Sequence, residues 1–451
     1  MHENETPENP PPPAAHPYAV LRNADYARYL LARFIAALGM QMLVTALDWE
    51  LYKRTNSALA LGFVGLSLMI PMILCTLPAG QVADRYNRKN IILGATLALA
   101  FASLGLTLAS AFIGLNQNAT TFQIFAYALL VITGVARTFL WPASAAFVTS
   151  LVTREELPRA ITFNSGAFQL SCVLGPSLAG LIIWLTQGAW LIYALNVVAG
   201  LACFALVAGI RHTHKIPPRE PTTFKTLVTG FKFVYQNKII LGTLTLDMFA
   251  VLLGGAVTLL PIFANEIIPL HNGADGLGLG ILRAAIPIGA VGCMFFIAHR
   301  PPLQKAGRTM LLCVAVFGVA TIFFGLANRA CLGRYISAPD GLWFWLAFGL
   351  MVLCGAVDNV SVVVRQTLVQ LLTPDEKRGR VSAVNSLFIG TSNEMGGFES
   401  GVTAQMFGPM MANSIATGTI LSTVVGGFGT VLVVLAVAWI WPEIRRYGKL
   451  S

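Results

Sequence analysis

Ionisable side chains stand inside stretches of this sequence that are otherwise apolar. The acids placed in this way include Asp247, Asp358 and Glu394, and the bases include Arg137 and Arg365. A charge in an apolar interior is costly, so such residues mark ion or substrate pathways or pair with one another. A buried carboxyl can carry a proton, whereas a carboxylate beside Arg stays charged. We therefore expect these residues to bind a proton or substrate, or to join helices as ion pairs.

Uncharged amides accompany these residues and could offer directional hydrogen bonds to a ligand. Asn359 follows Asp358, and Asn393 precedes Glu394. The further amide candidates are Asn164, Gln169 and Asn385. Arg365 follows Asp358 by seven positions, which places both on one face of a helix.

Two acids end the first apolar stretch. Asp48 and Glu50 are followed closely by Lys53 and Arg54. We expect a solvated ion pair near the outer membrane interface. Glu50 is kept as a candidate for proton or substrate binding.

The composition restricts what can position these residues. The chain has 451 residues, of which 56% are hydrophobic and 11% charged, with a mean hydropathy of +0.70. Soluble domains carry about 25% charged residues. A large soluble enzyme, a disordered protein and a disulfide scaffold are therefore excluded. No cluster of Cys and His suggests a metal, and no Walker loop or catalytic constellation occurs, so we expect no cofactor and no enzymatic activity.

Apolar stretches of membrane-spanning length recur along the chain, since about 20 residues cross a bilayer. Twelve spans are predicted, which makes this an all-α membrane protein. They are 27–52, 58–82, 91–113, 122–150, 161–186, 189–210, 239–265, 276–298, 309–328, 342–370, 381–407 and 415–441.

Basic residues give the predicted orientation of these spans. Of 30 Lys and Arg, 22 fall in the terminal flanks and even-to-odd loops, 4 in the other loops and 4 within spans. Positive charge stays on the cytoplasmic side, so both termini are predicted there. The net charge of +10 then reflects topology, and nucleic acid is not an expected partner.

An internal repeat divides the chain into halves. Residues 151–165 resemble residues 371–386, sharing Leu, Thr, Glu, Arg, Asn and Ser, and each copy lies between the fourth and fifth span of six. Two similarly oriented bundles suit alternating access about a central site. The predicted organisation is a disordered tail (1–20), a six-helix bundle (21–210), a linker (211–238), a second bundle (239–441) and a cytoplasmic tail (442–451). Within the linker, 222–237 has the spacing of an amphipathic surface helix, or of an extension of the seventh span.

The loop after the second span carries a specific motif, Gly80-Gln-Val-Ala-Asp84-Arg85-Tyr-Asn-Arg88-Lys89. It resembles the signature loop of the major facilitator superfamily. The resemblance implies that Gly80, Asp84, Arg85, Arg88 and Lys89 gate the cytoplasmic side by clamping the halves in the outward-open state. The alternative is a solvated turn with positive-inside charge.

The fifth span contains Gly175-Pro176-Ser-Leu-Ala-Gly180, which resembles the antiporter motif of the same superfamily with Ala179 in place of one glycine. The resemblance implies export by exchange. The alternative is a proline kink that serves packing alone.

Further segments, including 154–158, 379–388 and 392–394, resemble the enterobactin-exporter and macrolide-efflux branch. Arg137 occupies the place of the superfamily's membrane arginine, but Trp141 replaces the glycine four residues later. The resemblance implies two pseudo-symmetric halves and proton-coupled export of a small amphipathic molecule, such as a siderophore or antibiotic. The expected setting is a monomer in the lipid bilayer of a bacterial inner membrane. A lipid or lysophospholipid flippase, an uncoupled facilitator and a non-transporting sensor or scaffold remain alternatives.

Overall fold

The computed structural model describes residues 18–113, 119–211, 224–270, 274–299, 304–334, 339–410 and 414–448. These residues are almost entirely helical and include no strand. Residues 1–17 and 212–223, where the tail and the start of the linker are predicted, lie outside the described residues.

The first half is a bundle of six long helices. They are α1 (Ala24–Thr55), α2 (Ala58–Arg85), α3 (Arg88–Phe112), α4 (Ala119–Leu151), α5 (Leu157–Thr186) and α6 (Trp190–Ala208). A short turn, η1 (Ala19–Arg22), precedes them. The side chain of Asn23 accepts hydrogen bonds from the first amides of α1, which gives that helix a defined start.

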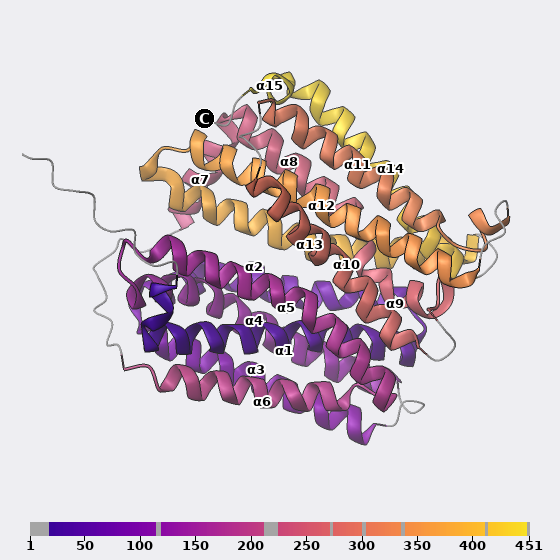
Figure 1. Cartoon of the computed structure of the whole chain (residues 1–451), viewed down its shortest axis with the longest axis horizontal. Helices are drawn as coiled ribbons and strands as arrows, with labels where there is room; N and C mark the ends of the chain where they lie inside the picture. Colours follow the sequence, from indigo (N-terminus) through magenta and orange to yellow (C-terminus); the bar gives the residue numbers. More distant parts are fainter. Residues whose placement is uncertain are drawn as a thin grey trace, which may run out of the picture.

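The second half repeats this arrangement with one broken helix. Its first crossing consists of α8 (Lys238–Leu253), η2 (Ala256–Leu259), α9 (Leu260–Ile262) and the π-helical turn η3 (Phe263–Ile267). Next come α10 (Asp275–Ala298), α11 (Ala306–Leu326), the turn η4 (Leu332–Arg334), α12 (Asp340–Leu372), α13 (Asp375–Met410), α14 (Ile415–Ile440) and the short α15 (Pro442–Arg446). Figure 1 shows the two bundles side by side.

Eleven crossings among the described residues are long and apolar enough to span a membrane. The remaining predicted span, 381–407, corresponds to α13, which has 36 residues. It is less apolar than the others because it carries Asn393, Glu394 and Glu399. The predicted twelve-helix fold in two halves is confirmed.

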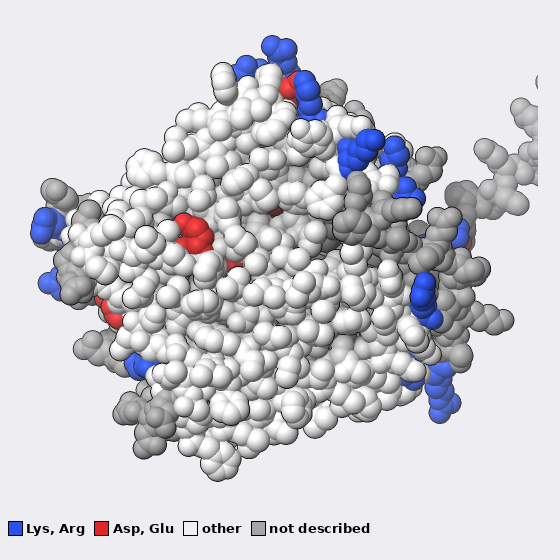
Figure 2. Space-filling model, turned by 180° about the vertical axis from the view of Figure 1, so that it is seen from behind, with Lys and Arg blue, Asp and Glu red and all other residues white. Residues whose placement is uncertain are grey.

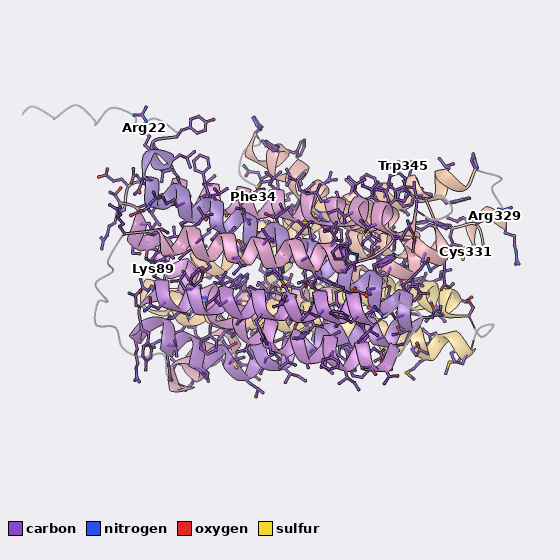
Figure 3. All side chains as sticks on the ribbon, turned by 90° about the horizontal axis from the view of Figure 1, so that it is seen from below. Arg22, Phe34, Lys89, Arg329, Cys331 and Trp345 are labelled. Carbon is purple, nitrogen blue, oxygen red and sulfur yellow. The ribbon has the colours of Figure 1, made fainter. Side chains whose placement is uncertain are left out.

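Charged residues lie mainly at the two ends of the bundle. Figure 2 shows a broad belt that is free of Lys and Arg and has few Asp or Glu atoms, with Lys and Arg gathered beyond it. Figure 3 shows Arg22 and Lys89 at the end near the chain's N-terminus, and Arg329 and Cys331 at the opposite end. We call the first the terminal end and the second the far end. An uncharged belt between charged ends is what a bilayer requires.

The linker contains a separate helix, α7 (Phe224–Gln236). Asn237 caps the start of α8 and so separates the two helices. On α7, Gly230 lies against the backbone of Arg380 in α13, and the rings of Phe231 and Phe388 are 5.8 Å apart. The linker helix thus packs on the terminal end of the second half.

The break in the first crossing of the second half occurs at Gly254 and Gly255. A Cβ on Gly255 would lie 2.8 Å from the carbonyl oxygen of Gly396 and 3.0 Å from Oγ of Ser400. A side chain would not fit between this segment and α13. The glycine pair therefore ends α8 and lets α13 approach the backbone closely.

Candidate functional site

The two halves are joined at the far end by an ion pair between Asp48 of α1 and Arg283 of α10. Arg283 also donates to the hydroxyl of Thr45, at 3.3 Å. Asp48 is only 4% exposed. Because each partner belongs to a different half, this pair must break if the halves separate at this end.

A second set of bonds between the two halves lies about one turn further along α1. Trp49 and Lys53 donate to the same carboxylate oxygen of Asp275, at 3.1 and 2.9 Å. The hydroxyl of Tyr52 donates to Glu266 in the π-helical turn. Residues at i, i+3, i+4 and i+7 share one helix face, so α1 presents a continuous polar strip to the second half.

Glu50 occupies a different face of α1 and stays within the first half. It forms a buried ion pair with Arg54, at 2.6 Å, and accepts hydrogen bonds from Ser110 and Tyr193. The expectation that Asp48 and Glu50 form a solvated pair with Lys53 and Arg54 is therefore wrong. Glu50 does pair with Arg54, but both are buried, and Asp48 pairs with Arg283 instead. Fully satisfied, Glu50 acts as a structural anchor in this conformation.

Glycines bring the two halves into backbone contact near the same end. A Cβ on Gly180 would lie 2.5 Å from the carbonyl oxygen of Gly276 and 2.9 Å from Cα of Gly280. The halves also meet where α2 contacts α13. There, a Cβ on Gly62 of α2 would lie 3.2 Å from the carbonyl oxygen of Phe398 in α13. Small residues permit such close crossing of membrane helices.

The segment with the antiporter-like motif thus serves two interfaces. Gly175 packs against α1, where a Cβ would meet Cβ of Gln41 at 2.5 Å. Pro176 is buried, and its carbonyl oxygen lies 2.5 Å from the place of a Cβ on Gly280 in the second half. The motif forms part of the contact between α5 and α10, so its packing depends on how the halves are arranged.

Glu394 of α13 lies against α2. Its Oε2 atom is 3.3 Å from the place of a Cβ on Gly65 in α2, and the charges of Arg137 and Asp48 act on it. Arg137 is exposed although it lies within α4. The structure therefore brings Glu394 and Arg137 near the ion pair of Asp48 with Arg283, and these four residues come from four helices and both halves.

Asp247 and Arg365 form a second group of charged residues, which lies inside the second half. Their ion pair links α8 to α12, and Arg365 is 3% exposed. Asp358 is partly exposed and is not the ion-pair partner of Arg365, despite the shared helix face. Asn359 donates to the carbonyl oxygen of Ala290 at 2.9 Å and so joins α12 to α10.

The predicted amides are distributed over both halves. Asn164 and Asn385 occupy matching places in the repeat, and each has a buried side-chain oxygen without a hydrogen-bond partner among the described residues. Asn393 is exposed and donates only within its own helix, at 2.8 Å. Gln169 is partly exposed on α5.

Two basic residues of the signature loop bond to backbone carbonyls of the first half in this conformation. Arg88 donates to the carbonyl oxygen of Ala146 at 3.0 Å, and Lys89 bonds the carbonyl oxygens of Ala208 and Ile210 at the end of α6. These contacts lie within the first half.

Two other members of the loop face open space. Arg85 is exposed, and a Cβ on Gly80 would have no neighbour within 4 Å. No other described helix therefore packs closely against Gly80 in this conformation. The side chain of Asp84 lies outside the described residues.

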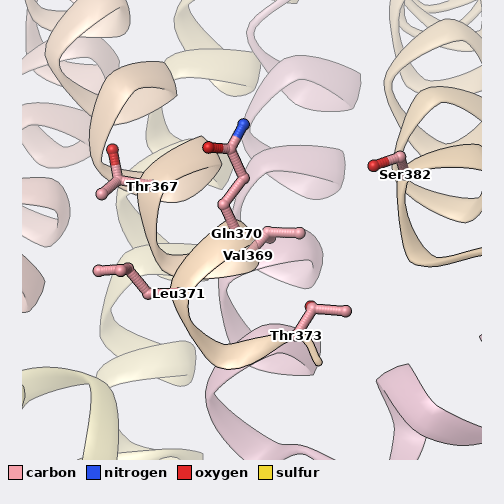
Figure 4. Close-up of a pocket in the computed structure, with 6 residues that line it drawn as sticks. All are labelled: Thr367, Val369, Gln370, Leu371, Thr373 and Ser382. Carbon is pink, nitrogen blue, oxygen red and sulfur yellow. The ribbon is translucent and has the colours of Figure 1, made fainter. Parts of the chain in front are cut away.

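The terminal end also contains a cavity between α12 and α13. It has a volume of about 440 Å³, and its lining includes Thr367, Gln370, Thr373 and Ser382 (Figure 4). Thr373 is buried, and its hydroxyl has no partner among the described residues. Polar groups at the terminal end thus line a cavity, whereas polar groups at the far end bond to one another.

The sequence did not identify the far-end residues Tyr52, Glu266 and Asp275 as functional. They lie at or beside helix ends, where charge is common and carries little information. A signal did exist, since Trp49 and Tyr52 share one face at the end of the predicted span 27–52, and Lys53 follows directly. Their partners could not be assigned without the tertiary structure.

Comparison with known sequences gives matches over most of the chain. The family model described as Major Facilitator Superfamily matches residues 29–397. The protein of Citrobacter koseri named enterobactin exporter EntS is 28% identical over 434 residues, which cover 93% of this chain and 92% of that protein. The Shigella flexneri protein of the same name is 26% identical over 430 residues, with 93% and 92% coverage.

Solved structures of low sequence identity share the fold. A D-xylose–proton symporter has a TM-score of 0.70 at 15% identity, covering 93% of this chain and 98% of the other. A bacterial homologue of the iron transporter ferroportin has a TM-score of 0.66 in its inward-facing state, at 16% identity with 92% and 99% coverage. Its outward-facing state scores 0.59 at 15% identity, with 93% and 99% coverage.

Proposed function

The chain belongs to the major facilitator superfamily, and from this premise we propose that it exports a small amphipathic molecule in exchange for protons. It is a multi-pass membrane transporter and not an enzyme. The relatives named enterobactin exporter match along nearly their whole length, which supports export as the direction of transport. A siderophore of the enterobactin kind is the first substrate to test, and an antibiotic or another amphipathic metabolite is the next.

The observation that carries this proposal is the charge cluster of Glu394, Arg137, Asp48 and Arg283. It lies against the closed far end and includes residues of both halves. A proton on Glu394 removes the cost of a charge in the membrane interior and changes the balance of charge around Asp48. Protonation and the bond between the halves are thus coupled through neighbouring charges.

The conformation of the structure fits the step of an export cycle in which the transporter takes up its substrate. Bonds between the halves close the far end, while Gly80 and Arg85 face open space at the terminal end. The higher TM-score against the inward-facing ferroportin homologue agrees with this arrangement. We place the terminal end in the cytoplasm, because it carries the excess of Lys and Arg.

The substrate would bind between the halves with its polar part near Arg137. That guanidinium is exposed and can pair with an anionic or phenolic group. The unpartnered oxygens of Asn164 and Asn385 supply acceptors on the two sides. Asp247, Arg365, Asp358 and Asn359 would hold the second half in shape around this space.

The signature loop would act in the opposite state. When the terminal end closes, Asp84, Arg85 and Arg88 would meet the second half and hold the outward-open conformation. This agrees with the exposure of Arg85 and the open space at Gly80 in the present conformation.

The test uses purified protein in liposomes with a pH-sensitive dye inside. Siderophores, macrolides, cationic dyes and lysophospholipids are added in turn, and a substrate should trigger proton movement. Glu394→Gln should abolish proton movement while substrate still binds. Glu443→Gln is the control, because Glu443 makes a surface ion pair with Lys238.

Three outcomes would count against the proposal. Transport that keeps its rate and its dependence on a proton gradient in Glu394→Gln would exclude that residue as the coupling site. Flux without proton movement would indicate a facilitator or flippase. Binding of a panel member without any flux would indicate a sensor.

A further inference from the structure

Three faces of α13 are covered by neighbouring helices around Glu399. Phe398 and Gly401 face α2, where a Cβ on Gly401 would meet the carbonyl oxygen of Ala58 at 2.7 Å. Ser400 faces the break after α8. Thr403 bonds the hydroxyl of Ser422 in α14, at 2.7 Å.

Glu399 lies on the remaining face, which carries exposed methionines. Successive residues of a helix are separated by about 100°, so Met395, Met406 and Met410 share the side of Glu399. They are 37%, 57% and 73% exposed. In a membrane-spanning bundle an exposed apolar stripe contacts lipid. Glu399 is therefore a carboxyl at the surface that faces the membrane.

A carboxyl on the membrane-facing surface is unusual at the depth at which Glu399 lies. It precedes the end of α13 by eleven residues, or about 16 Å at 1.5 Å per residue, within a hydrocarbon core about 30 Å thick. Glu399 has a hydrogen bond with Ser400, and none of the ion pairs of the described residues includes it.

The surroundings suit an apolar ligand that carries a positive charge. Methionine side chains adapt to varied apolar shapes. Phe63 of α2 is partly exposed, and its ring lies 5.6 Å from that of Phe398, the residue that precedes Glu399. The face of an aromatic ring attracts organic cations.

We propose that Glu399, with Met395 and Met406, forms a binding site for hydrophobic organic cations on the membrane-facing surface between α2 and α14. The cation pairs with the carboxylate, and its apolar groups lie along the methionines. The site is distinct from the charge cluster between the halves, and binding there is measured without transport.

The test measures equilibrium binding of radiolabelled tetraphenylphosphonium to the full-length protein in phosphatidylcholine nanodiscs. Tetraphenylborate is the matched anion, since it has the same shape and the opposite charge. Wild-type protein should bind the cation saturably and not the anion. Glu399→Gln should weaken binding of the cation by about tenfold or more, because the charge pair is lost in a medium of low dielectric constant.

Glu443→Gln is the matched control, since Glu443 carries the same charge but makes a surface ion pair with Lys238. It should leave the affinity for tetraphenylphosphonium within about twofold of the wild type. The proposal is overturned if wild-type nanodiscs take up no more cation than empty ones, or if they bind the anion equally well. It is also overturned if binding is lost in Glu443→Gln and kept in Glu399→Gln. The wild-type comparison of cation with anion holds even if a variant fails to fold.

Discussion

Substituting Ala for Gly180 should shift the protein away from the conformation seen here. The new Cβ would lie 2.5 Å from the carbonyl oxygen of Gly276 and 2.9 Å from Cα of Gly280. Both neighbours are backbone atoms, which cannot rotate away as a side chain could. The halves must separate at the far end, or the contact must be strained.

The expected magnitude follows from the cost of overpacking. An extra methyl group in a well-packed contact costs about 1–3 kcal/mol. If that cost applies only while the far end is closed, it changes the ratio of the two conformations by about 5- to 150-fold. A conformation that is rare in the wild type would then be readily detected.

The assay is a distance measurement between spin labels on opposite halves. Glu155 and Arg445 are exposed near the terminal end, and cysteines there would carry the labels after the seven native cysteines are replaced. Gly180→Ala should add a population with a shorter distance, because the terminal end closes as the far end opens.

Gly166→Ala is the matched control on the same helix. A Cβ at Gly166 would have no neighbour within 4 Å, so that variant should keep the wild-type distances. The reasoning is refuted if Gly180→Ala and Gly166→Ala give the same distance distribution in correctly folded protein.

Two ion pairs should respond differently to the loss of one partner. Glu50→Gln leaves Arg54 buried beside a neutral amide and should lower the free energy of unfolding by about 3–5 kcal/mol, whereas Glu443→Gln should change it by at most about 1 kcal/mol. Thermal unfolding in detergent compares them, and equal effects would contradict the assigned burial. Asp275→Asn should favour opening of the far end, and the difference from wild type should shrink in high salt because Lys53 is solvent-accessible. Spin-label distances across the far end at low and high salt test this, and a difference independent of salt would show that screening plays no part.

The local sequence was sufficient to predict the helices and their division into halves. A bilayer requires long apolar segments and leaves charge at their ends, so hydropathy and basic residues indicate where each helix begins and ends. The repeat around Asn164 and Asn385 indicated the two halves. The broken crossing was not predicted, since Gly254 and Gly255 stand in an uninterrupted apolar stretch, and their effect depends on the approach of α13.

The partners of the charged residues were decided only by the tertiary structure. Asp358 and Arg365 share a helix face, yet Arg365 pairs with Asp247 of another helix. Asp48 stands near Lys53 in sequence but pairs with Arg283 in the other half. Sequence periodicity gives the direction of a side chain relative to its own helix. Its partner depends on how each helix is rotated and placed against the next, which packing of the whole bundle determines.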